Sequence, residues 1–147
     1  MIRTLCLALG LLLAASPDSS QDAINKELED LTGTREITYL ELDGKEVPLG
    51  DLKEIRRVQQ GDRITWKRGD QTEFEVEFKI NLKDSPKSVD STYLTGPNKG
   101  KTHLGIYQLD GDDFTMCFAS FDKPRPTQFA TTPQSGLVLY KAKRVDR

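Results

Sequence analysis

The sequence contains few of the residues that build metal centres, disulfide frameworks or catalytic triads. Its 147 residues include one histidine and two cysteines. A catalytic zinc site needs three protein ligands, and a disulfide-stabilised domain needs several cysteine pairs. A Ser-His-Asp triad would have to use His103, which lies in an alternating segment where a packed or surface histidine is the usual role. We therefore expect a protein that is not an enzyme and that carries no metal or other cofactor.

An excess of positive charge is also lacking. The chain has 21 basic and 23 acidic residues, which gives a net charge of −2. Nucleic-acid binding needs a basic surface that neutralises phosphates, so this balance excludes nucleic acid as the main partner. The length allows one domain with one core of ordinary size.

The longest apolar run lies at the N-terminus. Residues 5–15 carry no charge, follow Arg3, and lead into small residues and Pro17. This order is typical of a secretory signal peptide, and the run is shorter than the ~20 residues that span a bilayer. We expect residues 1–15 to be removed and the rest to be exported to the periplasm, the cell envelope or the medium, without an integral membrane span. Leu13 is larger than the residue favoured near a cleavage site, so the position of cleavage is not determined. The alternative to a signal peptide is a buried N-terminal helix.

A short helix is expected after a polar linker over residues 16–21. Within residues 22–31, Ile24, Leu28 and Leu31 have the spacing of one helical face, and Asp22 can cap the first turn. Because this apolar stripe is short, the helix has to pack on a larger body to be stable.

From residue 34 onward the apolar residues alternate with polar ones. The clearest case is residues 73–80, where charged side chains stand at every second position. The side chains expected to point inward there are Phe74, Val76, Phe78 and Ile80. One dry face and one wet face are typical of an antiparallel sheet. In the preceding segment, Ile64 and Trp66 alternate in the same way.

The turn between these two segments can be assigned a register. A three-residue loop over residues 68–70 pairs Ile64 with Phe74 and Trp66 with Thr72, which keeps the apolar side chains on one face. We therefore expect a loop of odd length with Gly69 or Asp70 at positive φ.

Six more short strands are indicated by alternation and by turn residues. They are residues 36–42, 54–59, 87–93, 101–109, 112–118 and 136–145. Eight antiparallel strands in sequence order close most simply into an up-and-down barrel, which leaves no exposed edge. We expect an all-β, roughly eight-stranded antiparallel barrel over residues 22–147, with the short N-terminal helix and a proline-containing loop over residues 122–133.

Several motifs together resemble one family. They are Leu31-Thr32-Gly33-Thr34, Asp43-Gly44-Lys45, Gly96-Pro97-Asn98-Lys99-Gly100-Lys101, Gly105-Ile106-Tyr107, Cys117-Phe118, Pro124-Arg125-Pro126-Thr127 and Gly136-Leu137-Val138-Leu139. In this order and spacing they resemble the lipocalin-like conserved domain that is multiplied in Planctomycetes genomes. The resemblance runs from about residue 28 to residue 143. It implies a lipocalin-like barrel that is frequently exported, and it implies no established activity.

One position departs from the family pattern. The family usually has tryptophan where this chain has Arg35. That tryptophan closes the barrel floor beneath a basic residue from the last strand, for which Lys143 or Arg144 is available here. Arg35 would bring two cations together, at a cost unless Glu36 or Asp30 lies between them. We therefore expect a closed end that is built differently from that of the family.

The barrel interior is the strongest candidate for a binding site. Apolar walls with a few polar groups suit a small molecule. The candidate residues are Trp66, Phe74, Phe78, Tyr107 and Met116 on the walls, with Arg125 as an anion contact at the opening. The residues leave open whether Tyr107 or Ile106 faces inward. The leading hypothesis is a non-catalytic binder of a small apolar or amphipathic molecule, and the alternative is a structural or protein-interaction module of the cell envelope with a filled barrel.

Two other features have ordinary interpretations. Cys117 stands between apolar residues, where a small buried cysteine is favoured over a reactive thiol. Arg56 and Arg57 form a small basic cluster that we expect to be solvated at a strand end.

Overall fold

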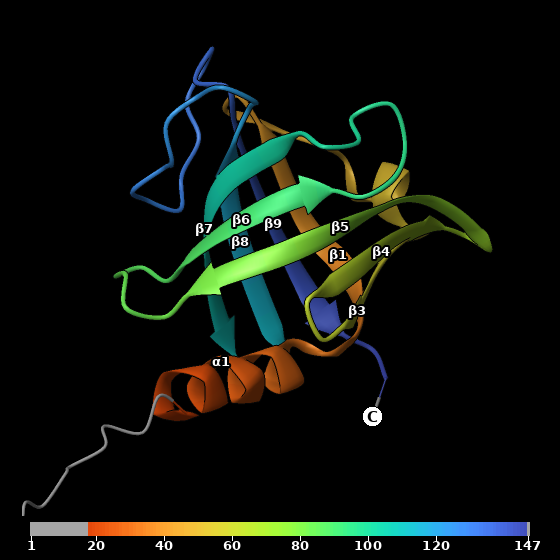
Figure 1. Ribbon diagram of the computed structural model, residues 1–147. Helices are drawn as coiled ribbons and strands as arrows, with labels where there is room; N and C mark the ends of the chain where they lie inside the picture. Colours follow the sequence, from red (N-terminus) through yellow and green to blue (C-terminus); the bar gives the residue numbers. More distant parts are fainter. Residues whose placement is uncertain (1–17, 147) are drawn as a thin grey trace, which may run out of the picture.

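The computed structural model describes residues 18–146 of the chain. A curled antiparallel sheet forms the body, and a single helix lies across one of its ends (Figure 1). The signal peptide expected over residues 1–15 lies outside the described residues.

The helix α1 (Asp18–Leu31) begins four residues earlier than the expected residue 22. Residues 18–21, expected to be linker, therefore belong to the helix, and a Gln21–Asn25 side-chain hydrogen bond of 3.0 Å supports this added turn. Leu31 is fully buried, and Ile24 and Leu28 pack against the barrel core as their spacing predicted.

Nine strands follow the helix. They are β1 (Gly33–Leu42), β2 (Lys45–Glu46), β3 (Ile55–Gln60), β4 (Arg63–Arg68), β5 (Gln71–Asn81), β6 (Ser88–Tyr93), β7 (Thr102–Asp110), β8 (Asp113–Ala119) and β9 (Leu137–Arg144). Sequential strands from β3 to β9 pair antiparallel, and β1 pairs with both β3 and β9, which closes an eight-stranded barrel. The predicted all-β barrel with one N-terminal helix is thus confirmed. The two-residue strand β2 and the 3₁₀ helix over Leu49–Leu52 were not predicted from the sequence.

The register of the β4–β5 hairpin differs from the prediction. Arg68 pairs with Gln71, so the turn has two residues, and Trp66 pairs with Phe74. A bulge on β5 at residue 73 shifts the pairing by one and returns the apolar side chains to one face. The prediction that Gly69 or Asp70 has positive φ is correct, because Gly69 lies at φ 58°.

The β7–β8 hairpin settles which residue of β7 points into the barrel. Its turn is Gly111-Asp112, and Tyr107 pairs with Met116 while Ile106 pairs with Cys117. Tyr107 belongs to the main core cluster inside the barrel. Ile106 belongs to a second, smaller apolar cluster with Cys117 and Leu139.

The second cluster lies under the long loop between β8 and β9. Phe129 of that loop packs on it, and the Cys117 thiol lies 3.7 Å from the carbonyl oxygen of Ala130. Cys117 is fully buried, as predicted. Burial also raises the pKa of this thiol, which keeps it protonated and unreactive.

Candidate ligand site

Two adjacent cavities occupy the end of the barrel opposite α1. The inner cavity has a volume of about 70 Å³, and the rim cavity has a volume of about 200 Å³. The inner cavity is lined by Trp66, Phe74, Val76, Phe78, Ser91, Tyr93, His103, Met116, Phe118 and Tyr140. The rim cavity adds the apolar residues Ile37, Leu40, Leu52, Ile55 and Val138 from β1, the 3₁₀ helix, β3 and β9, and two charged residues of the β4–β5 hairpin, Lys67 and Glu73. Because Trp66, Phe74, Phe118 and Tyr140 line both cavities, the two spaces share a wall of aromatic rings.

The structure brings together four of the six predicted site residues. Trp66, Phe74, Phe78 and Met116 all line the inner cavity. The Trp66 ring stacks on Phe74 with centroids 6.1 Å apart and meets the edge of Tyr140 at 5.5 Å. Aromatic pairs in this geometry stabilise one another.

Tyr107 points into the barrel but does not line either cavity. Its ring lies 6.0 Å from that of Phe114, and its hydroxyl donates a 3.0 Å hydrogen bond to Oε1 of Glu27 on α1. The same carboxylate oxygen accepts a 2.8 Å bond from Lys87. Burial, and then the neighbouring Glu27, raise the pKa of Tyr107, which keeps its hydroxyl as a donor. Tyr107 therefore fastens the helix to the barrel.

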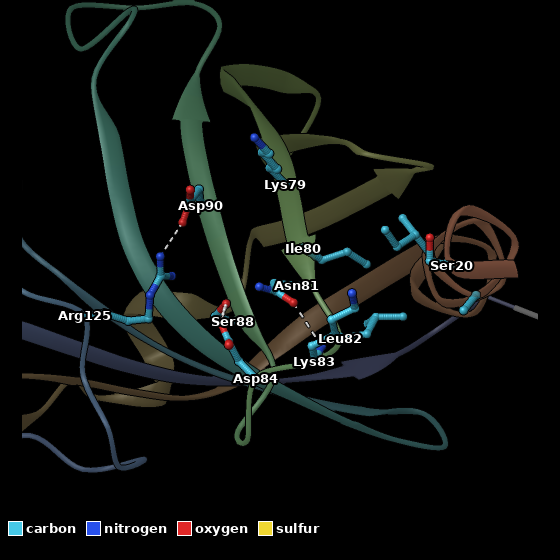
Figure 2. A pocket seen from close by; sticks show the side chains of 12 residues that line it. Ser20, Lys79, Ile80, Asn81, Leu82, Lys83, Asp84, Ser88, Asp90 and Arg125 are labelled. Atoms are coloured by element: carbon cyan, nitrogen blue, oxygen red, sulfur yellow. Dashed lines mark hydrogen bonds and ion pairs between the residues drawn. The ribbon is translucent and has the colours of Figure 1, made fainter. Parts of the chain in front are cut away.

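Arg125 is not at the opening, contrary to the prediction. Its guanidinium donates to the main-chain oxygens of Val89 (2.9 Å) and Gly105 (2.8 Å) and forms an ion pair of 2.6 Å with Asp90. All three partners belong to β6 and β7. Figure 2 shows the pair with Asp90 beside a groove outside the barrel. Arg125 therefore holds the long loop between β8 and β9 against the sheet, since its guanidinium contacts are all to β6 or β7.

Four aromatic residues of the wall were not predicted from the sequence. They are Tyr93, His103, Phe118 and Tyr140. His103 lies between Phe118 (4.7 Å) and Phe121 (4.0 Å), and its Nδ1 donates a 2.7 Å hydrogen bond to the carbonyl of Ala119. Partial burial lowers the pKa of His103. Strand alternation could have placed Phe118 with Met116 and Tyr140 with Ala142, because each pair is two residues apart on one strand.

Arg57 is fully buried beneath the inner cavity, although it was expected to be solvated. Its guanidinium carbon lies 4.3 Å from the ring centre of Phe114 and 5.1 Å from that of Phe78. Nε donates to the Tyr140 hydroxyl at 3.2 Å, and Nη2 donates to Oε1 of Gln59 at 2.7 Å. The alternation of β3 explains the error, because Arg57 and Gln59 lie on the inner face of the strand.

Arg35 lies next to this group and is also fully buried. It donates one hydrogen bond, from Nη1 to the carbonyl oxygen of Leu31 at the end of α1. Burial lowers the pKa of Arg35 to about 10, and the charges of Arg57 and Arg144 add to this effect. The expected approach of cations at the closed end is therefore present, with Arg57 as a second neighbour that was not foreseen.

The two carboxylates that were considered as neutralising groups are engaged elsewhere. Glu36 pairs with Arg56 at 2.7 Å, and Asp30 pairs with Lys26 at 2.6 Å. Three buried nitrogen atoms of the arginine pair, Nε and Nη2 of Arg35 and Nη1 of Arg57, have no hydrogen-bond partner among residues 18–146. We call Arg35 and Arg57 the floor arginines.

A larger depression lies on the outside of the barrel. This groove of about 570 Å³ runs between the start of α1 and the β5–β6 hairpin, with Ser20, Ile80 and Leu82 on its walls (Figure 2). Its two carboxylates already have partners, since Asp84 accepts a 2.5 Å bond from Ser88 and Asp90 binds Arg125. None of the buried side-chain atoms that lack a hydrogen-bond partner among residues 18–146 belongs to a residue of this groove.

Within residues 18–146, no cluster of three or more His, Cys, Asp or Glu side chains is placed to hold a metal ion. No helix in that part of the chain is both long and apolar enough to cross a membrane. Comparison with known proteins gives no match to a family model, a curated protein or a solved structure. The resemblance to the Planctomycetes lipocalin-like domain therefore stays a prediction.

Proposed function

We propose that this protein is an exported, non-catalytic binder of a small apolar or amphipathic molecule that occupies the two barrel cavities. The observation that supports the proposal is the shared aromatic wall of the inner and rim cavities. Small-molecule sites are mostly apolar concave spaces with a few polar groups, and this interior has that character. Each Å² of apolar ligand surface that leaves water contributes roughly 25 cal/mol to such binding.

The cavity dimensions limit the size of the ligand. The volumes of about 70 and 200 Å³ lie below the roughly 300–1,000 Å³ of sites that hold drug-sized molecules. The ligand is therefore a slender molecule whose free end reaches the rim. Such a chain would pass along Trp66, Phe74 and Tyr140.

Native mass spectrometry of the protein purified from its own host is the most direct test. A bound small molecule of defined mass, released on unfolding, supports the proposal. Trp66 provides a second readout, because it is the only tryptophan of the chain and lines both cavities. A short-chain alcohol that enters the barrel shifts its emission.

A pair of neighbouring substitutions on β6 localises the binding. Ser91 lines the inner cavity, and Thr92, the next residue, points away from it and bonds to Thr102 at 2.8 Å. Ser91→Leu fills the cavity and should abolish binding, whereas Thr92→Leu should preserve it. Circular dichroism checks that both variants fold.

The alternative is a structural or protein-interaction module of the cell envelope. The half of the barrel next to α1 is filled, and Leu42 and Leu49 are 42% and 56% exposed near the rim. This alternative is favoured if the protein carries no small molecule and if Ser91→Leu and Thr92→Leu respond alike to every apolar probe.

A further inference from the structure

The floor of the inner cavity leads directly to a buried positive charge. Phe78, Met116 and Tyr140 line the cavity. The Tyr140 hydroxyl donates to the thioether sulfur of Met116 at 3.4 Å and accepts from Nε of Arg57 at 3.2 Å. One phenol group therefore separates the cavity from the guanidinium.

This charge lacks a compensating anion among the described residues. Buried cations in proteins are normally paired with carboxylates, because an isolated charge in an apolar interior is costly. The hydrogen-bond partners of Arg57 are the neutral groups of Tyr140 and Gln59. Arg35 has only the carbonyl of Leu31, at the negative end of the α1 dipole.

The donors at the floor are also poorly used. Nη1 of Arg57 has no partner, and the Tyr140 hydroxyl is directed at a thioether, which is a weak acceptor. An anionic oxygen would form stronger, charge-assisted hydrogen bonds with both groups. The Tyr140 hydroxyl would then exchange its contact with the Met116 sulfur for a hydrogen bond to the anion.

We propose that the floor arginines and the Tyr140 hydroxyl bind the acidic head of an amphipathic ligand, a short-chain carboxylic acid whose apolar body extends between the aromatic rings of the two cavities. This inference rests on the proposed function and adds the chemical class of the ligand. Arg57 and Tyr140 contact the head, and Arg35 strengthens the positive potential behind Arg57.

The test compares octanoate with 1-octanol, which has the same chain and no charge. Affinities are measured by calorimetry and by Trp66 emission. We expect octanoate to bind at least about tenfold more tightly, which is ~1.4 kcal/mol. Acetate, which has the head without the chain, should bind at least about tenfold more weakly than octanoate.

Arg57 has a matched control in its neighbour Arg56. Arg56 lies on the other face of β3 and pairs with Glu36. Arg57→Met should abolish the preference for octanoate over octanol, whereas Arg56→Met should preserve the tenfold preference. If Arg57→Met does not fold, Tyr140→Phe serves instead. It should weaken octanoate binding several-fold more than it weakens octanol binding.

The outcomes separate this inference from the proposed function. Equal affinity for octanoate and octanol in the unmodified protein refutes the acidic head and leaves the cavity binder standing. A tenfold preference for octanoate that is undiminished in Arg57→Met or in Tyr140→Phe places the acid elsewhere and also refutes it. If acetate binds as tightly as octanoate, the floor arginines bind simple anions without an apolar chain, and the inference is refuted. If neither octanoate nor octanol binds, the cavity proposal itself fails.

Discussion

The two halves of the barrel interior have opposite constructions. The half next to α1, which we call the lower half, is filled by large side chains, among them Arg35, Arg57, Tyr107 and Phe114, all at most 1% exposed. The other half, the upper half, is lined by aromatic rings and retains two cavities. The contrast shows that the barrel confines its buried charge to the filled half and leaves the apolar half hollow.

Polar contacts, as well as packing, hold the lower half together. Glu27 of α1 accepts hydrogen bonds from Tyr107 and Lys87, and Arg35 donates to the last residue of the helix. Arg144 of β9 donates to the carbonyl of Asp30 at 2.8 Å and packs on Gly33, where an added Cβ would lie 2.9 Å from its Nη1. The helix is therefore an integral part of the closed end.

The largest expected effect comes from a phenylalanine in each half. Phe114→Ala should lower the free energy of unfolding by about 3–5 kcal/mol, because this fully buried ring packs on Arg57, Tyr107 and Tyr140. Phe74→Ala should cost roughly half as much, because Phe74 is partly exposed and already borders empty space. Urea unfolding of both variants measures the difference. Equal losses would mean that the two halves are equally well packed.

Removal of the charge of a floor arginine should increase stability, whereas the two phenylalanine substitutions decrease it. Arg35→Met should raise the free energy of unfolding by about 1–3 kcal/mol, because it replaces a buried cation, two of whose nitrogen atoms have no hydrogen-bond partner among residues 18–146, with an apolar chain of similar size. Thermal unfolding in the absence of ligand provides the measurement. The exposed-face variant Arg56→Met is the control and should change stability by less than about 1 kcal/mol. A destabilised Arg35→Met protein would show that the Leu31 contact outweighs the cost of burying the charge.

The contact between helix and barrel can be tested separately. Glu27→Gln keeps the shape of the side chain but removes the charge that binds Lys87 and accepts the Tyr107 hydroxyl. The expected loss is about 1–2 kcal/mol. Hydrogen exchange should show faster opening of α1 with little change in β4 and β5. Unchanged protection of the helix would contradict its role in closing the lower half.

The sequence predicted the barrel because side-chain alternation reports directly on a half-buried sheet. Val76, Phe78 and Ile80 are 2–7% exposed, as the pattern over residues 73–80 indicated. The predicted register of the β4–β5 hairpin was wrong, because a bulge and a loop of odd length both keep the apolar side chains on one face. Alternation alone does not distinguish the two. The early start of α1 was missed because residues 18–21 are polar and carry no apolar stripe.

The site was only half predictable for a related reason. Alternation divides the side chains of a strand into two faces, and the more hydrophobic face is then taken as the inner one. This rule is correct for Phe78 and Met116 and wrong for Arg57 and Gln59, which are buried on β3. Arg35 was recognised only because it occupies a position where the resembling family has tryptophan. Arg125 was misplaced because its partners are mainly carbonyl oxygens, which no side-chain pattern encodes.

The smallest expected effect is a pH dependence confined to the upper half. Partial burial among Phe118, Phe121 and Tyr93 lowers the pKa of His103 below its ordinary 6.5. The unfolded chain therefore binds a proton at a higher pH than the folded chain, so stability is complete above about pH 6.5 and declines as the pH falls below it. His103 is the only histidine of the sequence. The urea midpoint of the unmodified protein should therefore fall between pH 7.5 and 5.5, and in His103→Gln it should change less over this range. Glu27→Gln is the control and should leave the change of the urea midpoint with pH as it is, since it alters only the lower half. If the midpoint still falls in His103→Gln as it does in the unmodified protein, the pH dependence belongs to a group outside the cavity wall.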